Sequence, residues 1–198
     1  MEPLIGALLA GGTGSRLGGD KAVADLNGRP LAAYALDALR LHTDRQVFVA
    51  RADTVLPDLG IETWVEPDSI RHPLTGIVHA LRHARGPVVV LAADMPLITG
   101  EIMRAIALEP GTHIALAGGK MQPLCARYEP GALAALADFG DGDRLTRKVL
   151  ALDPEIVEFE DGESFLNVNT PADLAEAARI LSRRSSSWSG PAARNPRR

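Results

Sequence analysis

The sequence predicts an α/β fold in which a doubly wound, mostly parallel sheet carries a small β insertion. The first apolar run ends in glycines, strand-like and helix-like runs then alternate, and a late Gly-Gly pair marks a hairpin that interrupts the alternation. The 198 residues suit one domain over residues 1–181. Residues 182–198 are rich in Ser, Arg, Pro and Gly and lack apolar periodicity, so we expect a disordered basic tail there.

Each element follows from a local pattern. Residues 4–9 are almost wholly apolar, which is typical of a strand buried on both faces. Further strands are expected over residues 46–50, 61–65, 87–93 and 156–159, with two more in 115–127 joined by a Gly118-Gly119 turn. Helices are expected after the Asn27-Gly28 turn and Pro30, along the apolar face Leu74, Ile77, Val78 and Leu81, and over residues 99–108, 131–138, 145–150 and 171–181, the last capped by Thr170.

The composition narrows the class of protein. Hydrophobic residues make up 46% and charged residues 23%, as in ordinary globular domains. The net charge of −4 includes five arginines in residues 182–198, so subtracting them leaves −9 on the body, which argues against general nucleic-acid binding. With one cysteine, no basic leader-like segment and no apolar run of about 20 residues, we expect a cytoplasmic protein without disulfide or membrane span.

A glycine-rich segment, LAGGTGSRLGGDK, runs from Leu9 to Lys21 at the carboxyl end of the first strand, where open α/β sheets bind ligands. Gly11 and Gly12 allow backbone N–H groups to approach phosphates, and Arg16 and Lys21 add positive charge. The spacing fits neither the Walker motif nor the dinucleotide motif. Strand placement together with two cations favours a phosphate site over a flexible loop with solvated charges.

Asp94 ends the most apolar strand and is soon followed by Pro96, which turns the chain. Mg²⁺ is commonly held by one or two carboxylates and by substrate phosphate oxygens, so one aspartate opposite a cationic loop is a candidate Mg²⁺ site. The alternative is an aspartate that only forms a turn.

Asn167 and Asn169 alternate across Val168, so an extended backbone would project both amides to one side. They can bind phosphate, metal-bound water or a second substrate, or they can only form a turn and cap the next helix. Three other residues receive structural interpretations: His79 and His83 as solvated helix side chains rather than a metal pair, and Cys125 as a buried thiol.

The segments LAGG, GSR, LGGDK, LNGRPL, DMP and NVNTPADLA, in this order, resemble the molybdenum cofactor guanylyltransferase family over about residues 4–181. The resemblance implies a Rossmann-like nucleotidyltransferase domain of the nucleotide-diphospho-sugar transferase type. Such enzymes use Mg²⁺ to transfer GMP from GTP to molybdenum-molybdopterin with release of pyrophosphate. It also implies transient contact with a molybdenum insertion protein or an acceptor molybdoenzyme chaperone.

The resemblance and the residue arguments together select a set of positions. We expect Arg16, Lys21 and Asp94 to be catalytic, with Asp94 as the Mg²⁺ ligand. The nucleotide and its metal are expected to contact Leu9, Ala10, Gly11, Gly12, Lys21, Asp68, Gly76, Asp94, Asn167 and Asn169. One position departs from the family, which commonly has an asparagine after the second strand where this chain reads Val49, Ala50, Arg51. Arg144 or Arg147 can meet a pterin phosphate or lie on a solvated helix face.

The expected mechanism is in-line attack by the terminal phosphate of the pterin on the α-phosphorus of GTP, without a covalent intermediate or a general base. Two alternatives stay open. One is a sugar-phosphate or other small-molecule nucleotidyltransferase, including a CTP-using molybdopterin cytidylyltransferase. The other is a non-catalytic nucleotide-binding module.

Overall fold

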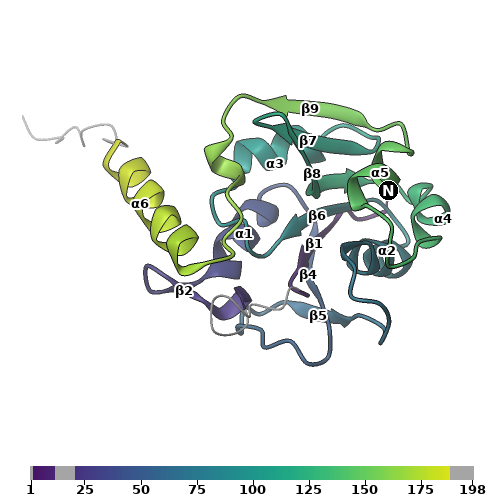
Figure 1. The fold of residues 1–198 in the computed structure, drawn as a ribbon, viewed down its shortest axis with the longest axis horizontal. Coiled ribbons are helices and arrows are strands. Elements are labelled where there is room, and N and C mark those ends of the chain that lie inside the picture. The colour runs from purple at the N-terminus through teal and green to yellow at the C-terminus, as the bar shows by residue number, and fades with distance from the viewer. Residues whose placement is uncertain (1, 12–20, 188–198) are drawn as a thin grey trace, which may run out of the picture.

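The computed structural model describes residues 2–11 and 21–187 and confirms the expected α/β class (Figure 1). Its strands are β1 Ile5–Leu9, β2 Asp25–Leu26, β3 Arg29–Pro30, β4 Arg45–Ala50, β5 Glu62–Val65, β6 Val88–Ala92, β7 His113–Ala117, β8 Lys120–Tyr128 and β9 Glu155–Phe159. Its helices are α1 Leu31–Arg40, α2 Pro73–Ala84, α3 Gly100–Ala107, α4 Ala132–Ala137, α5 Leu145–Leu150 and α6 Pro171–Ser187. Two 3-10 turns, η1 Lys21–Val23 and η2 Glu163–Phe165, complete the described elements.

The main sheet has seven strands in the order β5-β4-β1-β6-β8-β7-β9. The pairings β5 with β4, β4 with β1, β1 with β6 and β7 with β9 are parallel, and β8 runs antiparallel to both β6 and β7. The chain moves outward from β1 through β4 to β5 and then returns to place β6 on the other side of β1. This reversal is a topological switch point, and ligands of open α/β sheets bind at the carboxyl ends of strands at such a point.

Two helical layers cover the sheet, as Figure 1 shows, with α1 and α3 on one face and α2, α4 and α5 on the other. Strand residues alternate between the layers: Leu8 and Phe48 pack with α1 and α3, whereas Ala7 and Val47 pack with α2. Because β1, β4 and β6 lie between both layers, their central residues are fully buried and their sequences are almost continuously apolar.

Several predicted local signals are confirmed. Asn27 and Gly28 have φ values of 54° and 81° and form the turn between β2 and β3, which pair as an antiparallel ribbon. Gly118 and Gly119, with φ values of 55° and 70°, turn β7 into β8. A cap that the sequence analysis did not predict begins α3, where the Thr99 hydroxyl accepts a hydrogen bond from the backbone N–H of Ile102 at 3.3 Å.

The structure also refines the prediction. The expected β insertion is not a separate unit, because the hairpin of β7 and β8 pairs into the main sheet. The last helix, expected to end at Leu181, continues to Ser187. Its residues Ala177 and Ile180 pack with Leu26, Leu31, Leu97 and Val168 in a third apolar cluster. No helix within residues 2–11 and 21–187 is both long enough and apolar enough to cross a bilayer.

Candidate functional site

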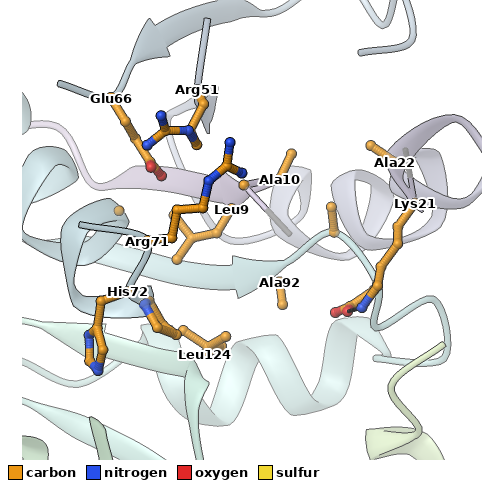
Figure 2. Close-up of a pocket in the computed structure, with 15 residues that line it drawn as sticks. Leu9, Ala10, Lys21, Ala22, Arg51, Glu66, Arg71, His72, Ala92 and Leu124 are labelled. Carbon is orange, nitrogen blue, oxygen red and sulfur yellow. Dashed lines mark hydrogen bonds and ion pairs between the residues drawn. The ribbon is translucent and has the colours of Figure 1, made fainter. Parts of the chain in front are cut away.

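A pocket of about 300 Å³ lies at the switch point, where β1 and β6 end (Figure 2). Its apolar floor includes Leu9, Ala92 and Leu124, and most of its polar groups come from segments that directly follow strands. The lining consists of Leu9, Ala10, Gly11, Lys21, Ala22, Arg51, Glu66, Arg71, His72, Pro73, Gly76, Ala92, Ala93, Asp94 and Leu124. The pocket thus lies at the edge of the sheet where the sequence analysis expected a ligand site.

One end of the pocket is formed by Lys21, Asp94 and Asn169. The Lys21 ammonium donates to Asp94 Oδ2 at 2.9 Å and to Asn169 Oδ1 at 2.5 Å. The Lys21 and Asp94 side chains are 17% and 19% exposed, so the ion pair is largely withdrawn from solvent. Asp94 and Asn169, which are far from Lys21 in the sequence, thus both contact the Lys21 ammonium nitrogen.

Backbone hydrogen bonds explain this convergence. The N–H of Ala93 donates to the carbonyl of Leu9 at 2.9 Å, which continues the pairing of β6 with β1 up to Asp94. The N–H of Val168 then donates to the carbonyl of Asp94 at 2.8 Å, which fixes the segment before α6 against the end of β6. The side chain of Asn169 is brought to Lys21 as a result.

The capping of α6 fixes Asn169 further. Asp173 Oδ2 accepts hydrogen bonds from the N–H groups of Asn169 at 2.9 Å and Thr170 at 2.8 Å, while the Thr170 hydroxyl accepts from the N–H of Asp173 at 3.2 Å. These reciprocal contacts are those of a capping box. They lower the pKa of Asp173 below its ordinary value, with the Asn169 N–H as the largest cause.

The other side of the pocket carries Arg51, Glu66 and Arg71, opposite Lys21 in Figure 2. Arg51 follows β4 and Glu66 follows β5, and the N–H of Glu66 donates to the carbonyl of Ala50 at 2.8 Å. Burial raises the pKa of the Glu66 carboxyl above its ordinary value, and the positive charge of Arg51 offsets part of this rise.

Two glycines approach the Glu66 carboxylate closely. A Cβ atom on Gly76, in the first turn of α2, would lie 2.9 Å from Glu66 Oε1 and 3.3 Å from Leu9 Cδ2. A Cβ on Gly11 would lie 3.3 Å from the same Oε1. The absence of side chains at both positions leaves room for a carboxylate that faces the pocket.

The structure brings most of the predicted residues together. Those that line the pocket are Leu9, Ala10, Gly11, Lys21, Gly76 and Asp94, and Asn169 joins them through Lys21. Gly12 and Arg16 lie outside the described residues. The two remaining predicted residues lie elsewhere. The Asp68 side chain is 98% exposed at the rim, where it pairs with Arg51 at 3.0 Å, and the Asn167 amide donates to the carbonyl of Phe165 at 3.3 Å.

Glu66 was missed by the sequence analysis. Its position directly after the third expected strand was the available signal, because the residues after strands β1, β4 and β6 all reach the pocket. The family resemblance pointed instead to Asp68, two residues later.

The structure confirms the interpretation of Cys125 and contradicts that of His79. Cys125 is fully buried, as expected, and burial raises the pKa of its thiol. The expectation of two solvated histidines is wrong for His79, which is only 9% exposed and stacks on His83 at 4.1 Å between ring centroids. Burial, with His83 and Arg82 nearby, lowers the pKa of His79 to about 4.

Asp94 and Asn169 suit a divalent cation chemically. Their oxygens already share one cationic partner, and hard oxygen donors are the ligands that Mg²⁺ prefers. The described residues hold no group of three or more His, Cys, Asp or Glu side chains suited to a metal. The protein part of such a site is therefore small, which fits an ion that also binds substrate phosphates.

Comparison with known proteins gives the family. The model of the MobA-like NTP transferase domain matches residues 6–158. The chain belongs to this family. It is 34% identical over 184 residues to a probable molybdenum cofactor guanylyltransferase of Deinococcus radiodurans, covering 89% of this chain and 94% of the relative. It is 31% identical over 189 residues to the molybdenum cofactor guanylyltransferase of Cereibacter sphaeroides, covering 90% and 97%.

Solved structures agree with membership of the MobA-like family. Molybdopterin-guanine dinucleotide biosynthesis protein A from Archaeoglobus fulgidus superposes with a TM-score of 0.70 at 27% identity, covering 90% of this chain and 99% of that one. The 2-C-methyl-D-erythritol 4-phosphate cytidylyltransferase of Thermus thermophilus shares the fold, with a TM-score of 0.65 at 17% identity and coverages of 89% and 98%. Because a cytidylyltransferase has the same fold, the fold alone does not select the base, and local side chains must do so.

Proposed function

We propose that this MobA-like chain is a Mg²⁺-dependent guanylyltransferase that transfers GMP from GTP to molybdenum-molybdopterin and releases pyrophosphate. The observation that carries the proposal is the convergence of Lys21, Asp94 and Asn169 at one end of a pocket whose other end holds a half-buried carboxylate. Phosphates need cationic and metal-binding groups, and a base needs hydrogen-bonding groups in a partly apolar slot. The names of the relatives support the same reaction.

Lys21 and Asp94 would have different roles in binding the triphosphate and its metal. Asp94, with the amide oxygen of Asn169, would hold Mg²⁺, which when bound neutralises phosphate charge and aligns the phosphate oxygens. Lys21 would then leave its present partners for the departing pyrophosphate, and Arg16 would add a second positive charge there. Leu9, Ala10 and Gly11, with Gly12, would border the nucleotide between the two ends.

The protein has no proton to remove in this reaction. The attacking group is a phosphate monoester oxygen that is already ionised at neutral pH, so alignment and charge neutralisation are sufficient. No histidine or carboxylate needs to act as a base.

Asp68 has a different role in this proposal from the direct contact expected from the sequence. Its carboxylate holds Arg51 at the rim of the pocket, at 3.0 Å from Nη2. Glu66 is the carboxylate that faces the nucleotide, since it lines the pocket between Gly11 and Gly76.

Pyrophosphate release tests the function. We expect release from GTP that requires both molybdenum-molybdopterin and Mg²⁺, with little release from CTP or UTP, and a molybdopterin guanine dinucleotide product detected by mass spectrometry. Lys120→Met, at the exposed first residue of β8, is the control for removal of a lysine and should retain activity. Equal release with a sugar 1-phosphate would favour the rival transferase, and GTP binding without any release would identify a binding module.

A further inference from the structure

Arg51 lines the pocket with a guanidinium that is not fully hydrogen-bonded. Its side chain is 16% exposed, and its Nε–H is buried without a hydrogen-bond partner among the described residues. Leaving a buried donor without a hydrogen bond lowers stability, so such a group is expected to serve a ligand or another purpose.

The rest of the Arg51 side chain is held in place. Nη2 donates to Asp68 Oδ1 at 3.0 Å, Nη1 donates to the carbonyl of Ser69 at 3.4 Å, and Nε lies 3.5 Å from Asp53 Oδ1. The two carboxylates are exposed at the rim, with side chains 66% and 98% exposed. They orient the guanidinium while the remaining N–H groups stay available, because a guanidinium has five donors.

Glu66 supplies the opposite chemistry beside it. Its carboxylate accepts hydrogen bonds only, and it interacts electrostatically with Arg51 on the same side of the pocket in Figure 2. No hydrogen bond to the Glu66 carboxylate is found among the described residues. The pocket therefore offers a fixed set of donors next to a free set of acceptors, a pattern that selects a ligand edge with acceptors beside donors.

We infer that Arg51 is a specificity-determining residue that donates to O6 and N7 of guanine while Glu66 accepts from N1–H and N2–H₂. This inference rests on the proposed function and names how that site chooses its base. Guanine alone among the common bases presents two acceptors next to two donors in this order. Adenine and cytosine place an amino group where guanine has O6, so their donors would face the Arg51 donors.

The test uses binding of nucleotide analogues to the full chain in Mg²⁺ buffer, measured by calorimetry. In 7-deaza-GTP a C–H replaces N7, which removes one acceptor for Arg51 and leaves the Glu66 edge intact. We expect wild type to bind 7-deaza-GTP about 10-fold more weakly than GTP, within the range of a lost bidentate contact. Arg51→Met, which keeps the length of the side chain, should bind the two nucleotides equally.

Arg71→Met is the matched control, since Arg71 also lines the pocket and pairs with Asp53 at 3.3 Å but is 54% exposed. It should keep the full ratio between GTP and 7-deaza-GTP. The inference is overturned if wild type binds both nucleotides equally, if Arg51→Met keeps the 10-fold ratio, or if GTP is not bound. Selective GTP binding that depends on Arg51, without pyrophosphate release on addition of molybdenum-molybdopterin, would overturn the proposed function and leave this inference standing.

Discussion

The two ends of the pocket differ in how far their polar groups hydrogen-bond with one another. At the Lys21 end, the ammonium, the Asp94 carboxylate and the Asn169 amide satisfy one another. At the Glu66 end, the carboxylate and the Arg51 Nε–H have no hydrogen-bond partners among the described residues, although both are removed from water to a large extent. The first end is a closed ion-pair cluster, and the second keeps a carboxylate and one guanidinium N–H without a hydrogen bond, although Arg51 forms ion pairs with Asp53 and Asp68 at the rim.

This difference matches two kinds of ligand chemistry. A triphosphate with its metal carries enough charge to compete for Lys21 and Asp94, so these groups can be paired with each other before it binds. A neutral base carries no such charge and gains little from displacing existing hydrogen bonds. Recognition of a base therefore requires groups that are unpaired and fixed in advance, at some expense in stability.

The largest expected effect comes from breaking the Lys21 end. Asp94→Asn and Lys21→Met should each lower kcat/KM for GMP transfer by about 100-fold to 1000-fold, because each removes charge stabilisation of the departing pyrophosphate. The double variant should be hardly worse than the poorer single variant, since the two groups act as a unit. Steady-state kinetics measure this, with circular dichroism as the control for folding. Fully additive losses would show that the two residues act separately.

The next largest effect is expected from a substitution of Glu66 at the other end of the pocket. Glu66→Gln should raise KM for GTP about 10-fold with a small change in kcat, because an amide accepts fewer hydrogen bonds from the base than a carboxylate and donates where the base also donates. It should also bind ITP, which lacks the amino group, with less loss than wild type. An unchanged KM for GTP would remove Glu66 from base recognition.

The same variant should be more stable than wild type at neutral pH. Burial raises the pKa of folded Glu66 above its unfolded value, so the folded state holds its proton more tightly. Wild-type stability therefore falls as pH rises through the interval between the unfolded and folded pKa, and the cost is fully present above it. Thermal unfolding should show a stabilising effect of Glu66→Gln that is present at pH 7 and disappears below the ordinary glutamate pKa.

The sequence predicted the fold more completely than the site, for a physical reason. Apolar periodicity, glycine turns and helix caps are local, and they located every strand of the main sheet to within a few residues. Lys21, Asp94 and Asn169 were each selected, but their common contact depends on the pairing of β1 with β6 and of residue 168 with residue 94. Such long-range register cannot be derived from local patterns.

The Glu66 end was harder to predict because its signal is not a motif. Asp68 was favoured by resemblance, yet its side chain faces solvent, whereas Glu66 is turned into the pocket by the hydrogen bond of its N–H to Ala50 at the end of β4. The Arg51 position was visible as a departure from the family pattern. That its Nε–H has no hydrogen bond could be seen only from the three-dimensional packing.

A smaller effect is expected from Gly76→Ala, which disturbs the Glu66 end of the pocket without removing any polar group. The new Cβ would meet Glu66 Oε1 at 2.9 Å, and that atom is the end of a flexible side chain that can move. Alanine also gains about 0.5–1 kcal/mol over glycine in a helix. We expect a folded protein, detected by an unchanged or higher Tm, whose KM for GTP rises by about 3-fold to 10-fold as Glu66 shifts. Gly131→Ala, with open space around its Cβ, is the control.

The smallest effect concerns the capping box that supports the Lys21 end. Asp173→Ala should lower the free energy of unfolding by about 1 kcal/mol, the usual cost of losing a helix cap, and should lower kcat by less than 10-fold through a looser Asn169. Because the folded pKa of Asp173 lies below its ordinary value, its stabilisation is present above that value and is lost as pH falls through the folded pKa. Urea unfolding should therefore separate wild type from variant at pH 7 and show a difference that shrinks as the pH falls into the acid range. Equal stability of wild type and variant at pH 7 would mean that α6 is held by its apolar contacts with Leu97 and Val168 rather than by the cap, and that Asn169 owes its place beside Lys21 to the Val168 and Asp94 backbone pairing alone.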